Sequence, residues 1–438
     1  MNEDRAYFTK EMKKTHTILV PTMLPIHFGI FAHMLEREGY HLKVLTNTGH
    51  EVVEEGLASV HNDMCYPALL AIGQLIDGVK NSGIPRDRVA VMITQTGGGC
   101  RASNYLYLLS KALKKSGYGD VPVISASFTN DEHTAGFRLS IPFLFKAAYA
   151  AFVADLIMLL GNQCKPYEVN LGETAALEEE LTKQTADFFY HMRVLSWKKC
   201  ETLMREIVER FKAIPRRKEK KVKVGIVGEI YVKYSPLGNN NLEDFLLSEG
   251  CEVVCPGFLD FALYCIYNGV EDYNFYGIGK MGAKVKKWLL KKADELEDRT
   301  NAIITENSDF TPMGKFSKLP GLVAEHISTG MKMGEGWLLT AEMADLIESG
   351  VNNVICTQPF GCLPNHIVGK GMMRSMKTKY PDANIAAIDY DPGASQVNQQ
   401  NRIKLMLENA RAFEREKAAE REEASVSAKP VSAEAKAM

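Results

Sequence analysis

The sequence is poor in several features that would indicate particular classes of protein. Its 52 Lys and Arg residues nearly balance 54 Asp and Glu residues, so the net charge is −2 and no basic surplus favours nucleic acid. The opening residues, 1–16, are charged and lack the apolar stretch of a signal peptide. The most apolar run, residues 141–161, contains Lys146 and Asp155, which predicts a buried helix and not a membrane span. We therefore expect a cytoplasmic protein without nucleic acid or membrane as a partner.

The sequence also lacks a P-loop of the form GxxxxGK[ST]. The glycines of residues 225–228, at the end of a predicted strand, do not continue into a complete GxGxxG fingerprint, so we interpret them as a strand end and loop. None of the nine cysteines forms the close CxxC pair that structural zinc favours. An odd cysteine number in a chain expected to be cytoplasmic also argues against a disulfide framework. Cysteines outside the core of such a protein are more often metal ligands or nucleophiles.

Short apolar strands alternate with helical patterns in both halves of the chain. Nearly unbroken apolar strands in this alternation indicate parallel sheets covered on both faces. We predict two doubly wound, flavodoxin- or Rossmann-like α/β domains over residues 1–215 and 216–416, with a long helical segment over about 137–213 that is interrupted near 162–172. The composition of residues 417–438 predicts a disordered tail. The predicted strands are 16–21, 42–46, 89–95, 121–127, 222–227, 252–255, 353–357 and 384–389.

Three cysteines stand where such domains bind ligands. Residues 91–95 lead through a glycine to Cys100, and residues 354–358 lead in the same way to Cys362. Both segments read as a strand, a glycine-containing turn, a cysteine and a helix, and ligands of doubly wound sheets bind beyond the carboxyl ends of strands. Cys65 comes two residues before a proline that suits the first position of a helix. At helix N-termini we expect the pKa of these thiols to be lowered, which favours the thiolate that binds metal.

Two chemistries are open to these three cysteines. Three thiolates on a [4Fe–4S] cluster would leave one iron without a protein ligand, free to bind a substrate oxygen. Alternatively, a Cys–His pair could act as a nucleophile, because His61 and His366 are close to Cys65 and Cys362 in the sequence. The other cysteines are expected to fill the core, apart from Cys164 in a predicted loop. The expected core cysteines are Cys200, Cys251, Cys255, Cys265 and Cys356.

Five stretches, within a similarity that covers roughly residues 15–410, resemble a known module. It is the C-terminal module of long acyl-CoA dehydratase activase-related proteins, which is in turn similar to the cluster-bearing subunits of 2-hydroxyacyl-CoA dehydratases. The stretches are HNDMCYPA (61–68), TQTGGGCRASNY (94–105), MGEGWLL (333–339), QPFGCLPNH (358–366) and AIDYDPG (387–393).

The resemblance implies a [4Fe–4S] cluster between two flavodoxin-like domains, with Cys65, Cys100 and Cys362 as its ligands. It also implies that an ATP-hydrolysing activase delivers one low-potential electron. In the dehydratases this electron forms a ketyl radical anion from a 2-hydroxyacyl-CoA thioester. Loss of the α-hydroxyl group and of a β-proton then gives the enoyl-CoA, and the electron is recovered. The dehydratases pair two unlike subunits, and we expect this chain to form a homo- or heterodimer. Because the sequence has neither a P-loop nor the acidic, glycine-rich opening of acetate-kinase-like ATPases, the activase must be a separate chain.

Polar residues around the cysteines are the remaining site candidates. Glu335 and His366 are candidates for catalysis, although a carboxylate in the first turn of a helix is favoured by the dipole alone. Amides near strand ends also commonly cap turns and helices. Gly97, Gly98 and Gly99 suit either a close approach of the backbone to a cluster or a phosphate cradle. The candidates for substrate binding are Gln95, Asn104, Tyr105, Gln358 and Asn365.

Three functions follow from the sequence. The first is a dehydratase-type lyase acting on an acyl-CoA thioester. The second is an ATP-coupled reductase of small molecules, or an electron-transfer component, without CoA chemistry. The third is a non-catalytic module that organises a complex with the ATPase.

Overall fold

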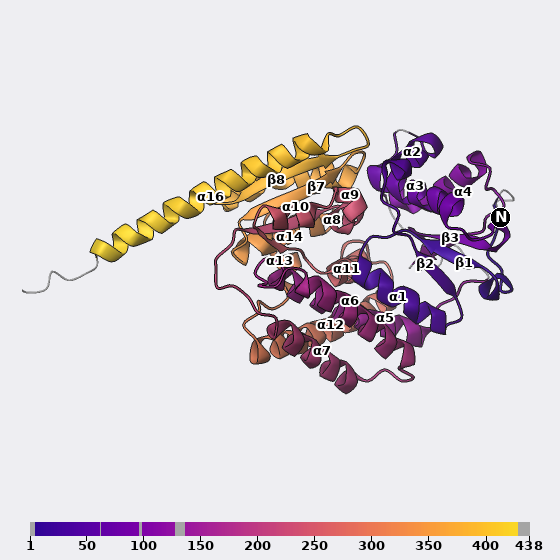
Figure 1. The fold of residues 1–438 in the computed structure, drawn as a ribbon, viewed down its shortest axis with the longest axis horizontal. Helices are drawn as coiled ribbons and strands as arrows, with labels where there is room; N and C mark the ends of the chain where they lie inside the picture. The colour runs from indigo at the N-terminus through magenta and orange to yellow at the C-terminus, as the bar shows by residue number, and fades with distance from the viewer. Residues whose placement is uncertain (1–4, 62, 96–98, 128–135, 428–438) are drawn as a thin grey trace, which may run out of the picture.

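The chain folds into two four-stranded parallel sheets with helices on both faces, as seen in a computed structural model (Figure 1). The structure describes residues 5–61, 63–95, 99–127 and 136–427. The strand order is β2-β1-β3-β4 in the first sheet and β6-β5-β7-β8 in the second, so the two sheets repeat one topology. This confirms the predicted fold class. The strands are β1 (Thr17–Val20), β2 (His41–Val44), β3 (Val89–Gln95), β4 (Val123–Ser127), β5 (Lys223–Gly228), β6 (Glu252–Val254), β7 (Asn353–Pro359) and β8 (Asn384–Tyr390).

Helices connect the strands and enclose both sheets. The first sheet lies between α3 and α4 on one face and α1 and α5 on the other, and the second lies between α14 and α15 on one face and α8, α10 and α16 on the other. The helices of the first half are α1 (Pro25–Arg37), α2 (His50–Ser59), α3 (Tyr66–Asn81), α4 (Tyr105–Lys115), α5 (Ile141–Cys164), α6 (Glu173–His191) and α7 (Trp197–Lys212). Those of the second half are α8 (Ile230–Tyr234), α9 (Pro236–Asn239), α10 (Leu242–Ser248), α11 (Phe258–Tyr276), α12 (Lys280–Asn307), α13 (Leu319–Val323), α14 (Trp337–Glu348), α15 (Met373–Lys379) and α16 (Gln396–Ser427).

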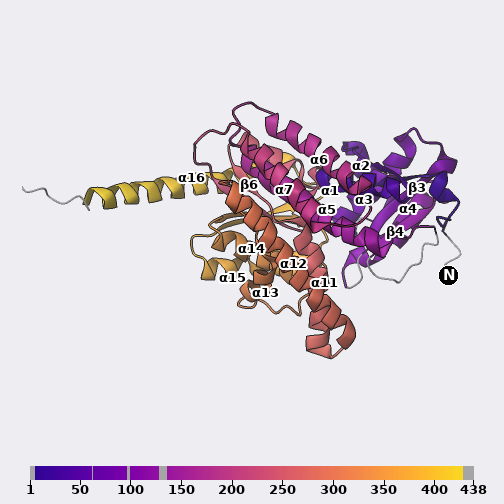
Figure 2. The ribbon, with the colours of Figure 1, turned by 90° about the horizontal axis from the view of Figure 1, so that it is seen from below.

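The long helical segment predicted from the sequence consists of α5, α6 and α7, with its break between Cys164 and Glu173. These helices share one apolar core with α11 and α12 of the second half. Helix α12 runs alongside α7 (Figure 2). Among the described helices, only α5 is long and apolar enough to cross a membrane, and 61% of its most apolar window is buried inside the protein. The core around the helical segment therefore extends across residue 216, where the sequence predicted the domain boundary.

Two features differ from the sequence-based expectations. Helix α11 was not predicted, because aromatic and branched residues in FLDFALYCIY read as strand formers. At the other end, α16 continues to Ser427 and extends away from the sheets (Figure 1), so residues 417–427 are helical where the composition predicted disorder. Ala, Glu, Lys and Arg, which dominate this stretch, are strong helix formers, and this accounts for the difference. Residues 428–438 of the predicted tail lie outside the described residues.

Candidate functional site

The loops that carry the three predicted ligand cysteines meet between the two sheets. The peptide N–H of Tyr66 donates to the carbonyl of Phe360 at 3.0 Å, which ties the loop before α3 to the loop after β7. A Cβ added to Gly361 would lie 3.0 Å from the Cα of Cys65, so only glycine lets these loops approach so closely. On the other side, a Cβ on Gly334 would lie 3.6 Å from the Cβ of Cys100. Residues far apart in the sequence thus form one region, which we call the cysteine junction: Cys65, Cys100 and Cys362.

The thiols in the junction lie within electrostatic range of one another and of buried polar groups. The Cys65 sulfur is 3.2 Å from the hydroxyl oxygen of Tyr105 at the start of α4. The charge of Cys65 raises the pKa of Cys362, and Cys100 has the same effect on the pKa of Cys65. Such mutual repulsion between thiolates would be relieved by a positively charged metal centre.

The prediction that the thiol pKa values are lowered is wrong for Cys65 and Cys362. Burial raises the pKa of Cys65 to about 11, although the Tyr105 hydroxyl and the backbone amide of Ala68 act in the opposite direction. Burial also raises the pKa of Cys362, and the nearby Glu335 carboxylate adds to the increase. The sequence indicated the helix N-termini but could not show the desolvation, which has the larger effect here.

Two buried carboxyl groups border the junction. Glu335 accepts a hydrogen bond from the backbone N–H of Ile230 at 3.0 Å, and Glu229 accepts one from Val232 at 2.9 Å. Burial raises the pKa of both carboxyl groups, and the negative charge of Glu335 adds to the increase at Glu229. Glu335 does not open a helix as predicted, because α14 begins two residues later, at Trp337.

Glu229 was missed in the sequence. It follows β5 directly, so its position at the carboxyl end of a parallel strand was the same signal that identified Cys100 and Cys362. A search for every ionisable residue at such strand ends would have found it.

The repeated topology relates the residues of the junction in pairs. Cys100 follows β3 and Cys362 follows β7, and these two strands hold the same place in their sheets. Cys65 lies just before α3, the helix that leads into β3, and Glu335 lies just before α14, the helix that leads into β7. Glu335 thus occupies in the second half the position that Cys65 occupies in the first.

Two of the five predicted substrate-binding residues contact a junction cysteine: the Tyr105 hydroxyl lies beside the Cys65 sulfur, and the backbone N–H of Asn365 donates to Cys362 and lowers its pKa. The side-chain oxygen of Gln95 accepts from the N–H of Leu106 at 3.1 Å, and the amide of Asn365 donates to the carbonyl of Thr357 at 2.8 Å. Both side chains therefore hold local backbone. Asn104 is exposed and does not cap α4 through its side chain.

The buried side chain of Gln358 donates to the carbonyl of Pro359 at 3.1 Å. Its oxygen has no hydrogen-bond partner within the described part of the chain. Of the five candidates, Gln358 therefore keeps an unused polar atom near the end of β7.

The alternative Cys–His pair is not formed. His61 is 71% exposed and its imidazole lies 3.4 Å from the Asp63 carboxylate. His366 is exposed in a helical turn after Cys362. Within the described residues, neither imidazole forms a hydrogen bond with a cysteine sulfur, so the structure does not support His366 as a catalytic partner of Cys362.

The cysteines outside the junction lie where the sequence predicted, with two exceptions. Cys164, expected in a loop, is the last residue of α5 and is fully buried. Cys265, expected in the core, lies on α11 and is exposed. The other four are buried as predicted: Cys200, Cys251, Cys255 and Cys356.

Part of the glycine-rich turn before Cys100 is not described. Gly97 and Gly98, together with Thr96, lie outside the described residues, as does Asn62 before Cys65. Gly99 is described, and a Cβ there would lie 2.8 Å from the Met333 sulfur. The close approach at this glycine is therefore made by the loop that also carries Glu335.

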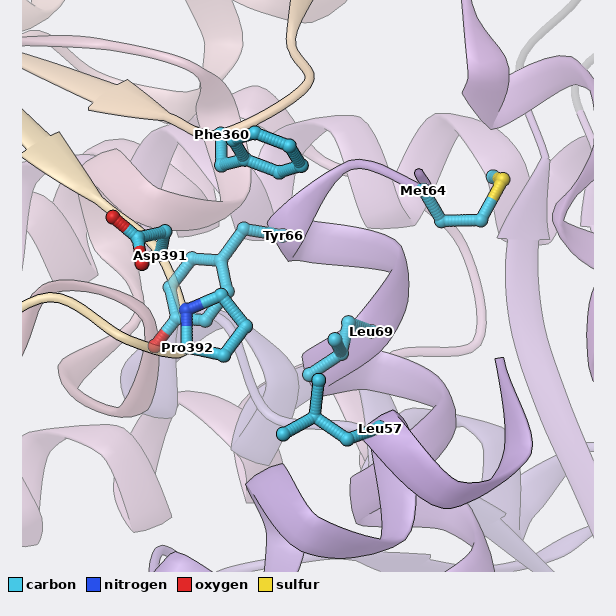
Figure 3. A pocket seen from close by; sticks show the side chains of 7 residues that line it. All are labelled: Leu57, Met64, Tyr66, Leu69, Phe360, Asp391 and Pro392. Atoms are coloured by element: carbon cyan, nitrogen blue, oxygen red, sulfur yellow. The ribbon is translucent and has the colours of Figure 1, made fainter. Parts of the chain in front are cut away.

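A cavity of about 180 Å³ opens beside the junction (Figure 3). Met64 and Phe360, each close in sequence to a junction cysteine, lie on its wall, and Tyr66 faces Asp391 and Pro392 across it. Burial, together with the negative charge of Asp391, raises the pKa of Tyr66 to about 12. The cavity is smaller than the roughly 300–1,000 Å³ of drug-sized ligand sites, so it could hold only part of a CoA thioester.

A larger cavity, of about 590 Å³, lies at the opposite edge of the second sheet, beside the first residues of β5, β7 and β8. Its lysines are already paired with carboxylates, including Lys223 with Glu252 and Lys220 with Glu414, both at 2.9 Å. Ligands of doubly wound sheets bind at the carboxyl ends of the strands, so we do not assign the site to this edge.

Within the described residues, no group of three or more His, Cys, Asp or Glu side chains is placed to hold a single metal ion. A multi-iron cluster requires a wider spacing of its ligands, because each cysteine binds a different iron and the sulfurs are farther apart than the ligands of one ion. No protein-family model matches the chain, and a search of curated proteins found no match.

Proposed function

We propose that this chain is an iron–sulfur protein that receives single electrons from a separate ATP-hydrolysing protein and acts on an acyl-CoA thioester, as a 2-hydroxyacyl-CoA dehydratase does. The observation that carries the proposal is the meeting of three cysteine loops, from two repeated parallel sheets, at the carboxyl ends of their strands. Such a junction between two doubly wound units is where a shared cofactor is expected.

The residues of the junction suit a [4Fe–4S] cluster by their donor chemistry. Cys65, Cys100 and Cys362 supply the thiolates that such clusters prefer, and neither nearby histidine competes for that role. When bound, the cluster would supply single-electron chemistry and an iron without a cysteine ligand. Because burial raises the pKa of the Cys65 and Cys362 thiols, cluster binding requires their deprotonation and would release protons.

Residues next to the cysteines would hold the substrate and protons. Glu335 occupies in the second half the position that Cys65 occupies in the first, so the junction has a carboxyl group there in place of a fourth cysteine. Burial raises the pKa of this carboxyl group and so favours its protonated form. We propose that it donates a hydrogen bond to the thioester carbonyl or hydroxyl. The Tyr105 hydroxyl, at 3.2 Å from the Cys65 sulfur, would orient that ligand.

The rim of the junction suits an apolar acyl group. Phe360, Leu363 and Ile367 surround Cys362 in the sequence and are 50%, 61% and 46% exposed. Large apolar side chains that remain exposed beside a polar centre commonly mark a ligand or partner surface. The acyl chain would pack against them, with the CoA portion outside the small cavity of Figure 3.

The test begins with the cofactor. The protein is purified without oxygen, and its iron, acid-labile sulfide and low-temperature EPR spectrum are measured. A content near four irons and four sulfides per chain, lost in a variant that lacks all three junction cysteines, supports the proposal. A wild-type protein that binds no iron after reconstitution contradicts it.

The second step separates dehydratase chemistry from simpler electron transfer. The reduced holoprotein is incubated with 2-hydroxyacyl-CoA thioesters, and enoyl-CoA formation is followed by mass spectrometry. Without an ATPase of its own, the pure chain should hydrolyse no ATP and should turn over only with ATP, reductant and a separate activase. A cluster that is reduced by the activase without any CoA-thioester binding would instead favour an electron-transfer component.

A further inference from the structure

The ends of α11 and α12 form a hairpin that projects from the body of the protein (Figure 2). Three large apolar residues of α12 lie on one face, because Met281, Val285 and Trp288 follow the i, i+4, i+7 spacing of a helix. They are 73%, 56% and 53% exposed. The turn of the hairpin adds further exposed apolar residues: Phe275, Tyr276 and Ile278.

A row of positive charge runs beside this apolar face. Helix α12 carries four lysines with i, i+4, i+7, i+11 spacing: Lys280, Lys284, Lys287 and Lys291. All four are exposed, and no carboxylate among the described residues pairs with them. An apolar stripe flanked by unpaired lysines has the form of a helix that binds in an apolar groove with an acidic rim.

The apolar surface continues from the hairpin to the cysteine junction. Gly330 packs against Phe275, since a Cβ there would lie 3.7 Å from the ring, and Lys332 forms an ion pair with Asp272 of α11. Met331 and Met333 on this loop are 40% and 58% exposed. We call the whole surface the hairpin patch: Phe275, Tyr276, Ile278, Met281, Val285, Trp288, Met331 and Met333.

Its last residue reaches the junction itself. The Met333 sulfur lies against Gly99, next to Cys100, and Gly334 lies against the Cβ of Cys100. A protein docked on the hairpin patch would therefore stand beside the cysteines. This continuity favours a protein that must reach the junction over a lipid surface, although Trp and Lys are also common in helices at membranes.

We propose that the hairpin patch is the docking surface for the electron-donating protein, and that the donor's matching surface has an apolar centre and an acidic rim. The inference rests on the proposed function, because it identifies how the partner of that site is recognised. The lysine row would steer the donor into contact, and the apolar stripe would hold it there.

The test uses the full-length holoprotein and the separate ATPase that reduces it. One variant carries Lys284→Glu and Lys287→Glu, and another carries Met281→Ala and Trp288→Ala. Because these side chains are exposed, both variants should fold with the melting temperature and iron content of the wild type. The matched control for charge is Lys198→Glu with Lys199→Glu, two exposed lysines on α7 without a carboxylate partner among the described residues. The matched apolar control is Leu171→Ala, at a residue 87% exposed.

The rate of cluster reduction is measured against ATPase concentration and, separately, with a small-molecule reductant. We expect each hairpin variant to need about tenfold more ATPase for the half-maximal rate, and the charge variant to lose most of its salt dependence. Reduction by the small molecule should not change, and the controls should behave as the wild type.

Three results would overturn the inference. In the first, the hairpin variants respond to the ATPase as the wild type does. In the second, the wild type sediments with anionic phospholipid vesicles, and the variants lose this binding without losing reduction. In the third, analytical ultracentrifugation shows a wild-type dimer that the variants disrupt while reduction is unaffected. A wild-type holoprotein that no ATPase reduces would contradict the proposed function instead, so the two failures are distinguishable.

Discussion

Replacing Gly361 with alanine tests whether the cysteine junction depends on close contact of its loops. Gly361 has a φ of 70°, and a Cβ there would lie 3.0 Å from the Cα and 3.3 Å from the N of Cys65. The left-handed backbone costs alanine about 1–2 kcal/mol. Reduced freedom of the unfolded chain returns about 0.4–1 kcal/mol of this cost. The added contact with the Cys65 backbone costs about 1–3 kcal/mol more, as overpacking does elsewhere. We therefore expect Gly361→Ala to lower the free energy of unfolding by about 2–4 kcal/mol.

Gly350, at the other end of β7, provides a matched control. Its φ is 86°, but a Cβ there would meet nothing within 4 Å. Gly350→Ala should therefore cost only about 1 kcal/mol, from the backbone conformation alone. Both variants are compared by urea unfolding of the metal-free protein and by iron content after anaerobic reconstitution.

The two variants should differ in both measurements. Gly361→Ala pushes the Cys362 loop away from Cys65, so it should also lose most of the bound iron, whereas Gly350→Ala should keep it. Equal stabilities together with equal iron contents would refute the reasoning. In that case, the approach of the Gly361 loop to Cys65 would not determine the geometry of the junction.

Three further predictions concern other buried groups. Burial raises the pKa of Glu297 to about 7 from an ordinary 4.5, so this carboxyl group destabilises the fold increasingly as the pH rises from about 4.5 to 7. Glu297→Gln should raise the free energy of unfolding by about 3 kcal/mol at pH 8 and by little at pH 4.5, and equal gains at both pH values would contradict this. Glu342→Gln alone should cost about 3–5 kcal/mol in urea unfolding, because Lys233 then loses its buried partner at 2.8 Å, while Lys233→Met with Glu342→Leu should recover most of the loss. Cys362→Ser should remove most of the iron, and Cys356→Ser should leave it nearly intact, because the Cys356 sulfur lies in the core, 3.5 Å from the Asn365 oxygen. The reverse pattern of iron loss would show that the wrong cysteine of this pair was chosen.

The parallel sheets could be predicted from the sequence because they depend on local patterns. Each core strand is a short apolar run bounded by polar or glycine residues, and all eight observed strands overlap the predicted ones. Helix α11 could not be predicted in this way, because its aromatic residues favour strands locally, whereas in the folded chain it packs as a helix in one core with α5 and α12. Tertiary contact decided the structure where local preference was misleading.

The candidate site was predictable to the extent that it follows from strand ends. Cys100 and Cys362 were found because each follows an apolar strand and a glycine. The pKa of Cys65 could not be inferred from its place at a helix N-terminus, because its value depends on how much protein covers the sulfur. The side-chain amides of Gln95 and Asn365 likewise bind nearby backbone groups. Their positions in the sequence fit this role and ligand binding equally well, so the sequence could not distinguish the two.

The repeated topology explains why Glu229 and Glu335 belong with the cysteines. If two similar α/β units face each other through the carboxyl ends of their strands, equivalent loops from both units must border the same space. Cys100 and Cys362 are such equivalents, and so are the loops of Cys65 and Glu335. The second unit therefore places a buried carboxyl group where the first places a thiol. A cofactor held by three cysteines would meet this carboxyl group on its fourth side, which is the side we assign to the substrate.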